Sequence, residues 1–205
     1  MFNVFYPYEC ADSVFTIDYD KLYAMGIRGL IFDIDNPLVL HGSDSTPAID
    51  DLFREVQSKG FKTLLLSNNE EKRINRFMQN IRTYYIHDAG KPRPAGYLRA
   101  LEVMELEKDQ VVVIGDQVFT DVLGANLAGM PSILVKFLRW PEEKALGKRR
   151  RLEQAVMLTY RLRPSCQHRL GGIALQGKRQ RRHFGDLHPL FYKFATEKET
   201  LKRHL

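Results

Sequence analysis

Five short runs of apolar and β-branched residues recur between residues 29 and 135, and a segment with helical periodicity separates each run from the next. The runs cover residues 29–34, 61–66, 83–86, 111–114 and 132–135. Runs of this kind are typical of strands that are buried on both faces of a parallel sheet, and the intervening helices are the crossovers that parallel strands need. The sequence therefore predicts a doubly wound α/β domain with a five-stranded parallel sheet.

Four segments between these runs are predicted to be helices, and three of them repeat apolar residues at helical spacing. The first segment begins at Pro47 and ends before Gly60, the third begins at Pro94, and the fourth covers residues 121–128 and ends at Gly129. We interpret the apolar stripes as core packing. The stripes are Ile49, Leu52, Phe53 and Val56; Ile74, Phe77, Met78 and Ile81; and Leu98, Leu101 and Met104.

Polar residues follow the predicted strands at the points where the strands end. Ligands of open parallel sheets bind beyond the carboxyl ends of the strands. We therefore expect these side chains to gather at one edge of the sheet. They are Asp33 and Asp35 after the first run, Ser67 and Asn68 after the second, Lys91 after the third, and Asp116 and Asp121 after the fourth.

The carboxylates of Asp33, Asp35 and Asp116 would repel one another if they converged. At an effective dielectric constant near 20, two like charges about 4 Å apart repel by roughly 4 kcal/mol. Mg²⁺ would relieve this repulsion, since it accepts carboxylates and uses phosphate oxygens to complete its coordination. Lys91, the Ser67 hydroxyl and the main-chain amides that follow it could bind the phosphate from the other side. The pattern predicts a magnesium-dependent site for phosphate chemistry.

The segment FDIDN places two carboxylates at positions i and i+2 of an extended chain, so that they point to the same side. One carboxylate can attack phosphorus to form an acyl phosphate, while the other protonates the leaving oxygen and later activates water. Each signal has an alternative when it stands alone. A DxD segment also occurs in metal-binding glycosyltransferases, Ser67 could cap the helix near Glu70, and Lys91 could be a surface lysine. Their order at successive strand ends favours a single site.

The ordered segments FDIDN, LLLSNN, AGKPRP and VVVIGDQVFTD resemble the four motifs of the haloacid dehalogenase (HAD) superfamily, and in particular its class IIIA phosphatases of the YqeG type. The flanking segments SVFTIDYDKLYAMGIRGLIFDIDN and DVLGANLAGMPSILVK are similar too, and KRRRLE more loosely, so that the resemblance covers roughly residues 7–158. It implies a HAD-like Rossmannoid three-layer sandwich.

The resemblance also implies roles for the residues at the strand ends. Asp33 would be the nucleophile and a Mg²⁺ ligand, and Asp35 the acid/base residue, whose main-chain carbonyl also binds the metal. Ser67, Asn68 and Lys91 would hold the phosphoryl group. Asp116 would ligate Mg²⁺ directly, with Asp121 supporting the metal site. The family resemblance extends to a mitochondrial phosphatidylglycerophosphate phosphatase, which suggests a phosphorylated lipid head group as the substrate.

The spacing of the motifs leaves no room for a cap domain. There are 31 residues between Asp35 and Ser67 and 23 between Ser67 and Lys91, whereas a separate domain needs at least ~50. The site is therefore expected to be open, which favours a large or surface-bound phosphoester over a small enclosed metabolite.

Pro37 departs from the family pattern, in which Thr is usual at this position. Proline removes a hydroxyl and an amide donor, and it biases Asn36 toward extended geometry. An alternative interpretation follows: a catalytically impaired HAD-fold protein that binds anionic lipid or nucleic acid through its basic tail.

The charge of the chain is divided between two parts. Residues 1–138 hold 14 Lys and Arg against 19 Asp and Glu, a net charge of −5, and residues 139–205 hold 17 against 6, a net charge of +11. We assign residues 1–138 to a HAD-like phosphatase domain and residues 139–205 to a basic extension that is partly helical or disordered. Residues 148–163 predict a helix with Leu152, Ala155, Val156 and Thr159 on one side. Packing on the domain, contact with an anionic membrane and contact with nucleic acid all remain open for it.

The remaining sequence features concern the location of the protein and the state of its cysteines. No stretch approaches ~20 uninterrupted apolar residues, and the N-terminus lacks the pattern of a secretory signal. We expect a cytoplasmic protein that is peripheral at a membrane if the basic helix binds lipid. Cys10 and Cys166 are far apart in the sequence and are interpreted as free thiols.

Overall fold

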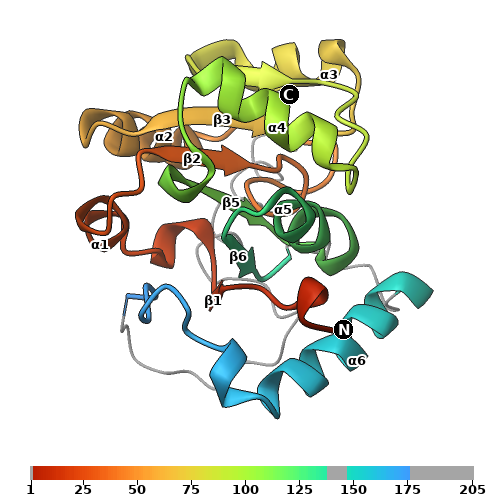
Figure 1. Cartoon of the computed structure of the whole chain (residues 1–205). Helices are drawn as coiled ribbons and strands as arrows, with labels where there is room; N and C mark the ends of the chain where they lie inside the picture. Colours follow the sequence, from red (N-terminus) through yellow and green to blue (C-terminus); the bar gives the residue numbers. More distant parts are fainter. Residues whose placement is uncertain (1, 138–146, 176–205) are drawn as a thin grey trace, which may run out of the picture.

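The computed structural model describes residues 2–137 and 147–175 (Figure 1). The fold is an α/β domain built on one parallel sheet with the strand order β1-β6-β5-β2-β3-β4. The strands are β1 (Glu9–Ala11), β2 (Gly29–Phe32), β3 (Lys62–Leu66), β4 (Tyr84–Ile86), β5 (Val111–Gly115) and β6 (Ser132–Val135). The predicted parallel sheet is confirmed, but it has six strands and not five.

The sixth strand, β1, lies at the edge of the sheet and pairs in parallel with β6, with Glu9 opposite Ile133. Its three residues contain no apolar run, which is why the sequence pattern did not indicate a strand. Glu9 is nevertheless buried, and its carboxylate accepts a hydrogen bond from the Gly172 amide at 3.1 Å. Residues from the far end of the described chain therefore complete the environment of this strand.

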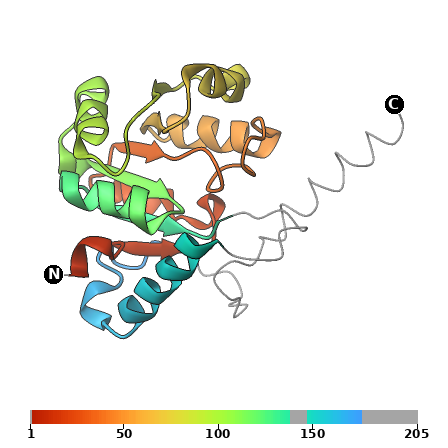
Figure 2. The ribbon, with the colours of Figure 1, turned by 90° about the vertical axis from the view of Figure 1, so that its right-hand side faces the viewer.

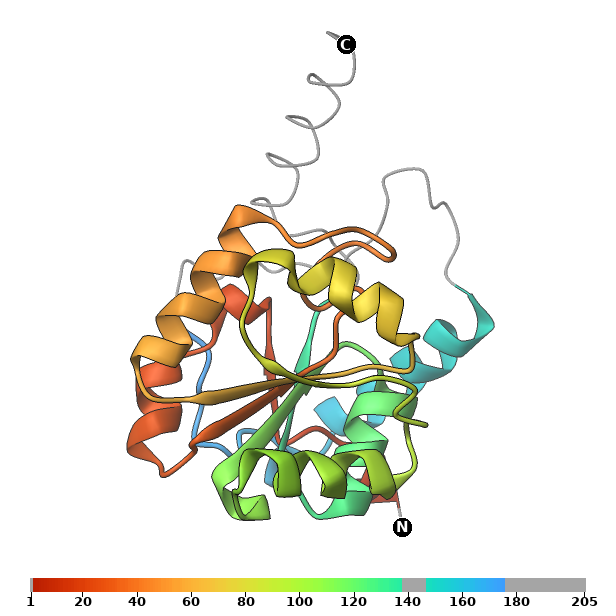
Figure 3. The same ribbon diagram turned by 90° about the horizontal axis from the view of Figure 1, so that it is seen from above.

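Helices cover both faces of the sheet, which gives three layers (Figure 3). One face packs against α1 (Tyr19–Ala24), α2 (Pro47–Ser58) and α3 (Glu71–Phe77), and the other against α4 (Pro94–Met104) and α5 (Leu123–Ala128). Single-turn 3-10 segments lie at Phe2–Phe5, Val14–Thr16, Met78–Asn80, Lys108–Gln110 and Pro164–Cys166, and Val118–Val122 forms one π-helical turn.

The helices begin and end near the predicted residues. Thr46 caps α2 by accepting a hydrogen bond from the Ile49 amide, and Pro47 occupies the first turn. Gly129 ends α5 with a φ of 78°, a left-handed conformation that glycine adopts at little cost. The predicted stripe on α4 needs a correction: Leu98 is 46% exposed, and Tyr97 and Ala100 are buried instead. Tyr97, Ala100 and Met104 lie at positions i, i+3 and i+7 of one helical face, and Leu98 lies one residue off that face.

The basic segment forms helix α6 (Lys148–Arg161), which lies beside β1 and the N-terminal residues (Figure 2). Its buried residues are Glu153, Met157 and Tyr160. The Tyr160 ring packs on Tyr6 with 5.6 Å between the centroids. Of the predicted stripe, Leu152 and Ala155 are exposed, Val156 is half-buried against the cluster of Tyr6 and Met157, and Thr159 accepts a hydrogen bond from the Tyr6 hydroxyl at 3.0 Å. Residues 139–146 and 176–205 of the predicted extension lie outside the described residues.

Two further expectations concern the described residues. Cys10 and Cys166 are both free, as expected. Within residues 2–137 and 147–175, no helix has the length and apolar character needed to cross a membrane.

The topology fixes where a ligand can bind. The chain builds β2, β3 and β4 outward in one direction and then returns to place β5 and β6 on the other side of β2. The order of strands therefore reverses between β2 and β5, and such a switch point is where open α/β sheets bind ligands. Asp33 follows β2 and Asp116 follows β5 directly. Between Asp35 and Lys91 the chain holds only α2, β3, α3, a 3-10 turn and β4 with their loops.

Candidate active site

Asp33 and Lys91 form a buried ion pair at this switch point. The amide of Asp33 continues the sheet by donating to the Ile114 carbonyl of β5 at 3.0 Å. Lys91 Nζ lies 2.7 Å from Asp33 Oδ1 and 2.8 Å from Asp121 Oδ1. Burial raises the pKa of Asp33 to about 6, since it outweighs the attraction of Lys91, and the neighbouring Asp121 raises it further.

Lys91 remains a cation in this site. Burial by itself would lower the pKa of Lys91, but the carboxylates of Asp121 and Asp33 outweigh it and raise the pKa above the usual value. The backbone of Lys91 is held by Asn68, whose Oδ1 accepts from the Lys91 amide at 2.8 Å and whose Nδ2 donates to the Lys91 carbonyl at 3.2 Å. Asn68, which was predicted to bind the phosphoryl group, thus uses its side chain to contact the backbone of Lys91.

Three carboxylates gather at this position, and they come from Asp33, Asp116 and Asp121. One oxygen of each lies within 4.8 Å of the others. The π-helical turn Val118–Val122 carries Asp121 back toward the end of β5, where its Oδ2 accepts from the Gln117 amide at 3.0 Å. Gly115 leaves the room for this return, because a Cβ there would lie 2.4 Å from the Asp121 side chain.

These three residues fit a divalent cation. Burial raises the pKa of Asp116 well above its usual value; Arg150 opposes the shift, and Asp121 and Asp33 add to it. Asp116 Oδ1 is buried and has no hydrogen-bond partner among the described residues. Two oxygens bound to one Mg²⁺ lie at most ~4.2 Å apart, so the observed spacing needs only a small contraction. A cation here would satisfy the orphan oxygen and offset the repulsion among the three carboxylates.

The carboxylate of Asp35 lies apart from this acidic group. It accepts hydrogen bonds from the Gly42 amide at 3.0 Å, from Asn69 Nδ2 at 2.5 Å and from Arg73 Nη2 at 2.9 Å. Burial alone would raise the pKa of Asp35, but these three donors together hold it below its usual value. The environment of Asp35 therefore favours its ionised form, and Asp121 is the residue that joins Asp33 and Asp116.

Ser67 lies at the end of β3, one strand away from Asp33. Its hydroxyl is buried and accepts from the Asn69 amide at 3.1 Å. The hydroxyl thus closes a local turn, while the N-cap position of α3 belongs to Glu70. A hydroxyl that accepts one hydrogen bond still has its own proton to donate to a ligand.

The loop around Pro37 differs from the expected geometry. Asn36 has a φ of 79°, in the left-handed region, and not the extended conformation that the following proline was expected to impose. The Asn36 amide donates to the Val39 carbonyl at 2.7 Å, and the Val39 amide donates to the Ile34 carbonyl at 3.4 Å. Asparagine tolerates this conformation better than most residues. Main-chain hydrogen bonds on either side of Pro37 hold the loop.

Comparison with known proteins identifies the family to which the chain belongs. A family profile described as HAD-hydrolase-like matches residues 88–137. The chain is also 39% identical over 132 residues to the probable phosphatase YqeG of Bacillus subtilis (strain 168), and the match covers 64% of this chain and 77% of that protein. This chain belongs to the YqeG family of the HAD superfamily. The resemblance stated from the sequence motifs is thereby confirmed.

Solved structures that resemble this YqeG family member are more distant in sequence. The cobalt-bound deoxy-D-mannose-octulosonate 8-phosphate phosphatase YrbI of Haemophilus influenzae is 16% identical, with a TM-score of 0.45 over 56% of this chain and 70% of that chain. A hydrolase from Streptococcus pneumoniae TIGR4 is 14% identical, with a TM-score of 0.45 over 65% of this chain and 100% of that chain.

Arg150 is the residue beside the acidic group that sequence reasoning missed, and Asn69 and Arg73, which contact Asp35, were missed as well. Arg150 Nη2 contacts Asp116 Oδ2, and its Nη1 donates to the Asp116 carbonyl at 2.8 Å. Arg150 comes from α6, 34 residues after Asp116, and stands in the basic run KRRRLE. Such a run ordinarily indicates a solvated helix face. Two signals were available: the loose family resemblance of KRRRLE, and Glu153, an acidic residue one turn later within the basic run.

The expected openness of the site does not extend to these carboxylates. The exposed fraction is 7% for Asp33, 0% for Asp116 and 2% for Asp121. Arg150 covers Asp116 from α6, and Lys91 covers Asp33 and Asp121 from the loop after β4. The absence of a separate domain between the motifs therefore does not leave the acidic group exposed.

Proposed function

We propose that this YqeG family member is a magnesium-dependent phosphatase that hydrolyses phosphomonoesters through an aspartyl phosphate on Asp33. The observation that carries the proposal is the contact of Asp33 with Lys91 beside two further buried carboxylates at the switch point of the sheet. Asp33, Asp116 and Asp121 would hold the cation, which supplies positive charge to the phosphate oxygens when it is bound.

Each protein group has a defined task in this proposal. A carboxylate oxygen of Asp33 attacks phosphorus as the bond to the leaving oxygen breaks. Lys91 neutralises the incoming phosphate, and the Ser67 hydroxyl with the amide of Asn68 can donate to its oxygens. A water molecule then attacks phosphorus and releases Asp33 as a carboxylate with inorganic phosphate.

Asp35 would move the protons in both steps. Its ionised form, favoured by Arg73 and Asn69, is suited to accept a proton from the attacking water. Protonation of the leaving oxygen in the first step requires the acid form, so the negative charge of a bound phosphate would have to raise the pKa of Asp35.

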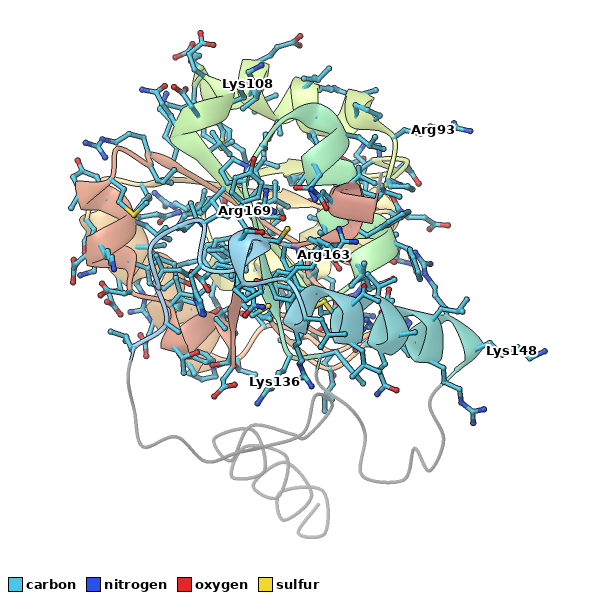
Figure 4. All side chains as sticks on the ribbon, turned by 60° about the horizontal axis from the view of Figure 1, so that its bottom comes forward. Arg93, Lys108, Lys136, Lys148, Arg163 and Arg169 are labelled. Atoms are coloured by element: carbon cyan, nitrogen blue, oxygen red, sulfur yellow. The ribbon has the colours of Figure 1, made fainter. Side chains whose placement is uncertain are left out.

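The proposed substrate is a large phosphomonoester such as phosphatidylglycerophosphate, reached by peripheral contact with an anionic membrane. Support comes from the outward side of α6, where Leu152, Leu158 and Leu162 are 61%, 59% and 82% exposed. Lys148 and Arg151 are exposed on the same helix, and Figure 4 shows Lys148 projecting from its N-terminal end. Exposed leucines flanked by basic residues are typical of helices that lie in a membrane interface. We call these five residues the outer face of α6.

The nucleophile is tested by Asp33→Asn, which preserves the size of the side chain. Turnover of p-nitrophenyl phosphate in Mg²⁺ should fall on the order of 10⁴-fold or more, as it does when a nucleophile is removed. The wild-type protein, quenched during turnover with a phosphomonoester, should carry a phosphoryl group on Asp33 in a peptide digest. The control is Asp109→Asn, an exposed aspartate between α4 and β5, which should leave turnover unchanged. Equal activity in Asp33→Asn would remove the covalent mechanism.

A further inference from the structure

Helix α6 sends one arginine into the acidic group. The guanidinium of Arg150 holds Asp116 at two points, the carboxylate oxygen Oδ2 and the main-chain carbonyl, the latter at 2.8 Å. The side chain of Asp116 is 0% exposed and that of Arg150 is 16% exposed. A planar guanidinium that engages two oxygens of one residue fixes direction as well as distance.

Glu153 holds Arg150 in this position from behind. Its carboxylate is 0% exposed, and its Oε2 accepts from Arg150 Nη1 at 2.8 Å. Its Oε1 accepts from the Phe119 amide at 3.4 Å, in the turn that follows Asp116. A buried carboxylate is costly without partners, so these contacts also anchor α6 to that turn. The centroid of the Phe137 ring lies 4.5 Å from the guanidinium carbon of Arg150, and this cation–π contact supports the same position of the side chain.

The contacts of Arg150 leave Asp116 with one free oxygen. Oδ2 is engaged by the guanidinium, whereas Oδ1 is buried and has no hydrogen-bond partner in the described part of the chain. Asp116 also belongs to the group in which Asp33 and Asp121 each offer an oxygen within 4.8 Å. The orphan oxygen is an observation separate from the clustering of the acids, and both indicate a cation at the same place.

The charges at the site favour the same arrangement. Three carboxylates face two cations, Lys91 and Arg150. The residual negative charge still attracts a divalent cation, while the two basic groups reduce the repulsion that would otherwise spread the carboxylates apart. Arg150 can do this without occupying the cation position, because its contacts are with Oδ2 and the main chain.

We infer that Arg150 is a positioning residue of the metal site: held by Glu153, it fixes Asp116 so that Oδ1 is presented to the cation. This inference rests on the proposed function only in that it takes Asp116 as a metal ligand. It makes α6 a required part of the site, although the helix lies beyond the four motifs. Loss of a group that orients a metal ligand typically lowers metal affinity by about 10–100-fold.

The experiment measures metal binding directly and not turnover. Binding of Mn²⁺ to the full chain is followed by electron paramagnetic resonance of the free ion, for the wild-type protein and for Arg150→Ala, Arg150→Lys and Glu153→Gln. Arg150→Ala should weaken Mn²⁺ binding about 10–100-fold. Arg150→Lys should lose less, because an ammonium retains the charge but not the fork. Arg161→Ala, at an exposed position on the same helix, should bind as the wild type does.

Each outcome decides one question. Binding by folded Arg150→Ala that is as tight as in the wild type, or tighter, overturns the inference, and tighter binding would mean that the guanidinium competes with the cation. If Arg150→Ala does not fold, unchanged binding in both Arg150→Lys and Glu153→Gln overturns it equally. A wild-type protein that binds no Mn²⁺ overturns the metal dependence in the proposed function as well, so the two failures are distinct.

Discussion

The side chain of Asn68 brackets the backbone of Lys91, accepting from its amide at 2.8 Å and donating to its carbonyl at 3.2 Å. Asn68 lies in the loop between β3 and α3, and Lys91 lies on the loop after β4. The two hydrogen bonds therefore tie the loops of neighbouring strands together at the point from which the Lys91 side chain reaches Asp33. The placement of the ammonium group depends on an amide side chain that does not itself contact Asp33.

Asn68→Ala removes both hydrogen bonds and should displace Lys91. Each net hydrogen bond contributes about 0.5–1.5 kcal/mol to stability, so the protein should stay folded. A displacement of about 1 Å at a reacting group can cost on the order of 100-fold in rate, and we expect a loss of 10- to 100-fold in kcat/KM for p-nitrophenyl phosphate. The control is Asn75→Ala at an exposed position of α3. Normal kcat/KM in Asn68→Ala would mean that the position of Lys91 does not depend on these two hydrogen bonds.

The central part of the sheet was predictable because burial on both faces requires continuous apolar runs. Residues 111–114 and 132–135 have such runs, and they form β5 and β6 with almost the predicted bounds. Strand β1 was missed because Glu9 is polar and is buried only with partners from residues 168–172. The hydrophobic pattern of a short segment depends only on residues close in sequence, so it cannot indicate that residues 168–172 would provide partners for Glu9.

The site was predictable to a similar extent. Because the ends of parallel strands meet at one edge, the topology alone brings Asp33 and Asp116 together. The direction in which a side chain turns depends on its partners. Asp35 turns to Arg73, a residue in the middle of a charged helical segment. Arg150 reaches Asp116 from a helix that follows β6 only after residues 136–147 along the chain, so no spacing in the sequence indicates the contact.

Arg73→Ala should change the pH dependence of catalysis. Arg73 Nη2 lies 2.9 Å from Asp35 Oδ1 and helps to keep the pKa of Asp35 below its usual value. An arginine next to an aspartate lowers its pKa by about 1–3 units. Its removal should therefore move the limb of the pH–rate profile that reports Asp35 to higher pH.

The control for this shift is Arg76→Ala. Arg76 donates to the Gly42 carbonyl at 2.6 Å and pairs with Asp44 at 2.7 Å, so it braces the same loop without contacting Asp35. That variant should lower activity at all pH values by a similar factor, if at all. A profile of Arg73→Ala that keeps the wild-type limbs would exclude Asp35 as the residue that titrates during catalysis.

Asp33 makes the stability of the metal-free protein depend on pH. Its pKa is about 6 in the folded protein against 3.8 for an ordinary aspartate. The folded state therefore holds a proton that the unfolded state has released between these values. The favourable contribution is present below pH 4 and is lost as the pH rises through 6. With about 1.4 kcal/mol for each pKa unit, the free energy of unfolding in EDTA should fall on the order of 2–3 kcal/mol across this range.

Urea denaturation at pH 5 and pH 7.5 checks this expectation. In EDTA the wild-type protein should be less stable at pH 7.5, and Asp33→Asn should reduce the difference, because its side chain carries no proton to lose. Mg²⁺ should stabilise the wild-type protein more at pH 7.5 than at pH 5, since it binds the ionised carboxylates. Asp109→Asn should behave as the wild type does. A metal-free protein that gains stability between pH 5 and 7.5 would contradict the buried, protonated state of Asp33.

The outer face of α6 yields a prediction that is independent of catalysis. Replacing Leu158 and Leu162 together by glutamate places two negative charges on the outer face of α6 near its C-terminal end. The substitutions remove apolar area and repel anionic lipid, where each basic residue near the surface contributes about 1 kcal/mol. Binding to vesicles of phosphatidylglycerol and phosphatidylcholine, measured by sedimentation, should fall at least 10-fold. Turnover of the soluble p-nitrophenyl phosphate should be unchanged, because the buried side of α6 keeps Arg150 in place.

The matched control is Leu98→Glu, a leucine 46% exposed on α4, which lies on one face of the sheet away from α6. It should bind vesicles as the wild type does. Vesicles of phosphatidylcholine alone distinguish the electrostatic contribution to binding from the apolar one. The wild-type protein should bind these neutral vesicles much more weakly if Lys148 and Arg151 contribute. Equal binding of the wild type and the double glutamate variant to anionic vesicles would show that the exposed leucines serve another contact, and hydrolysis of a membrane-embedded phosphomonoester would then not depend on the outer face of α6.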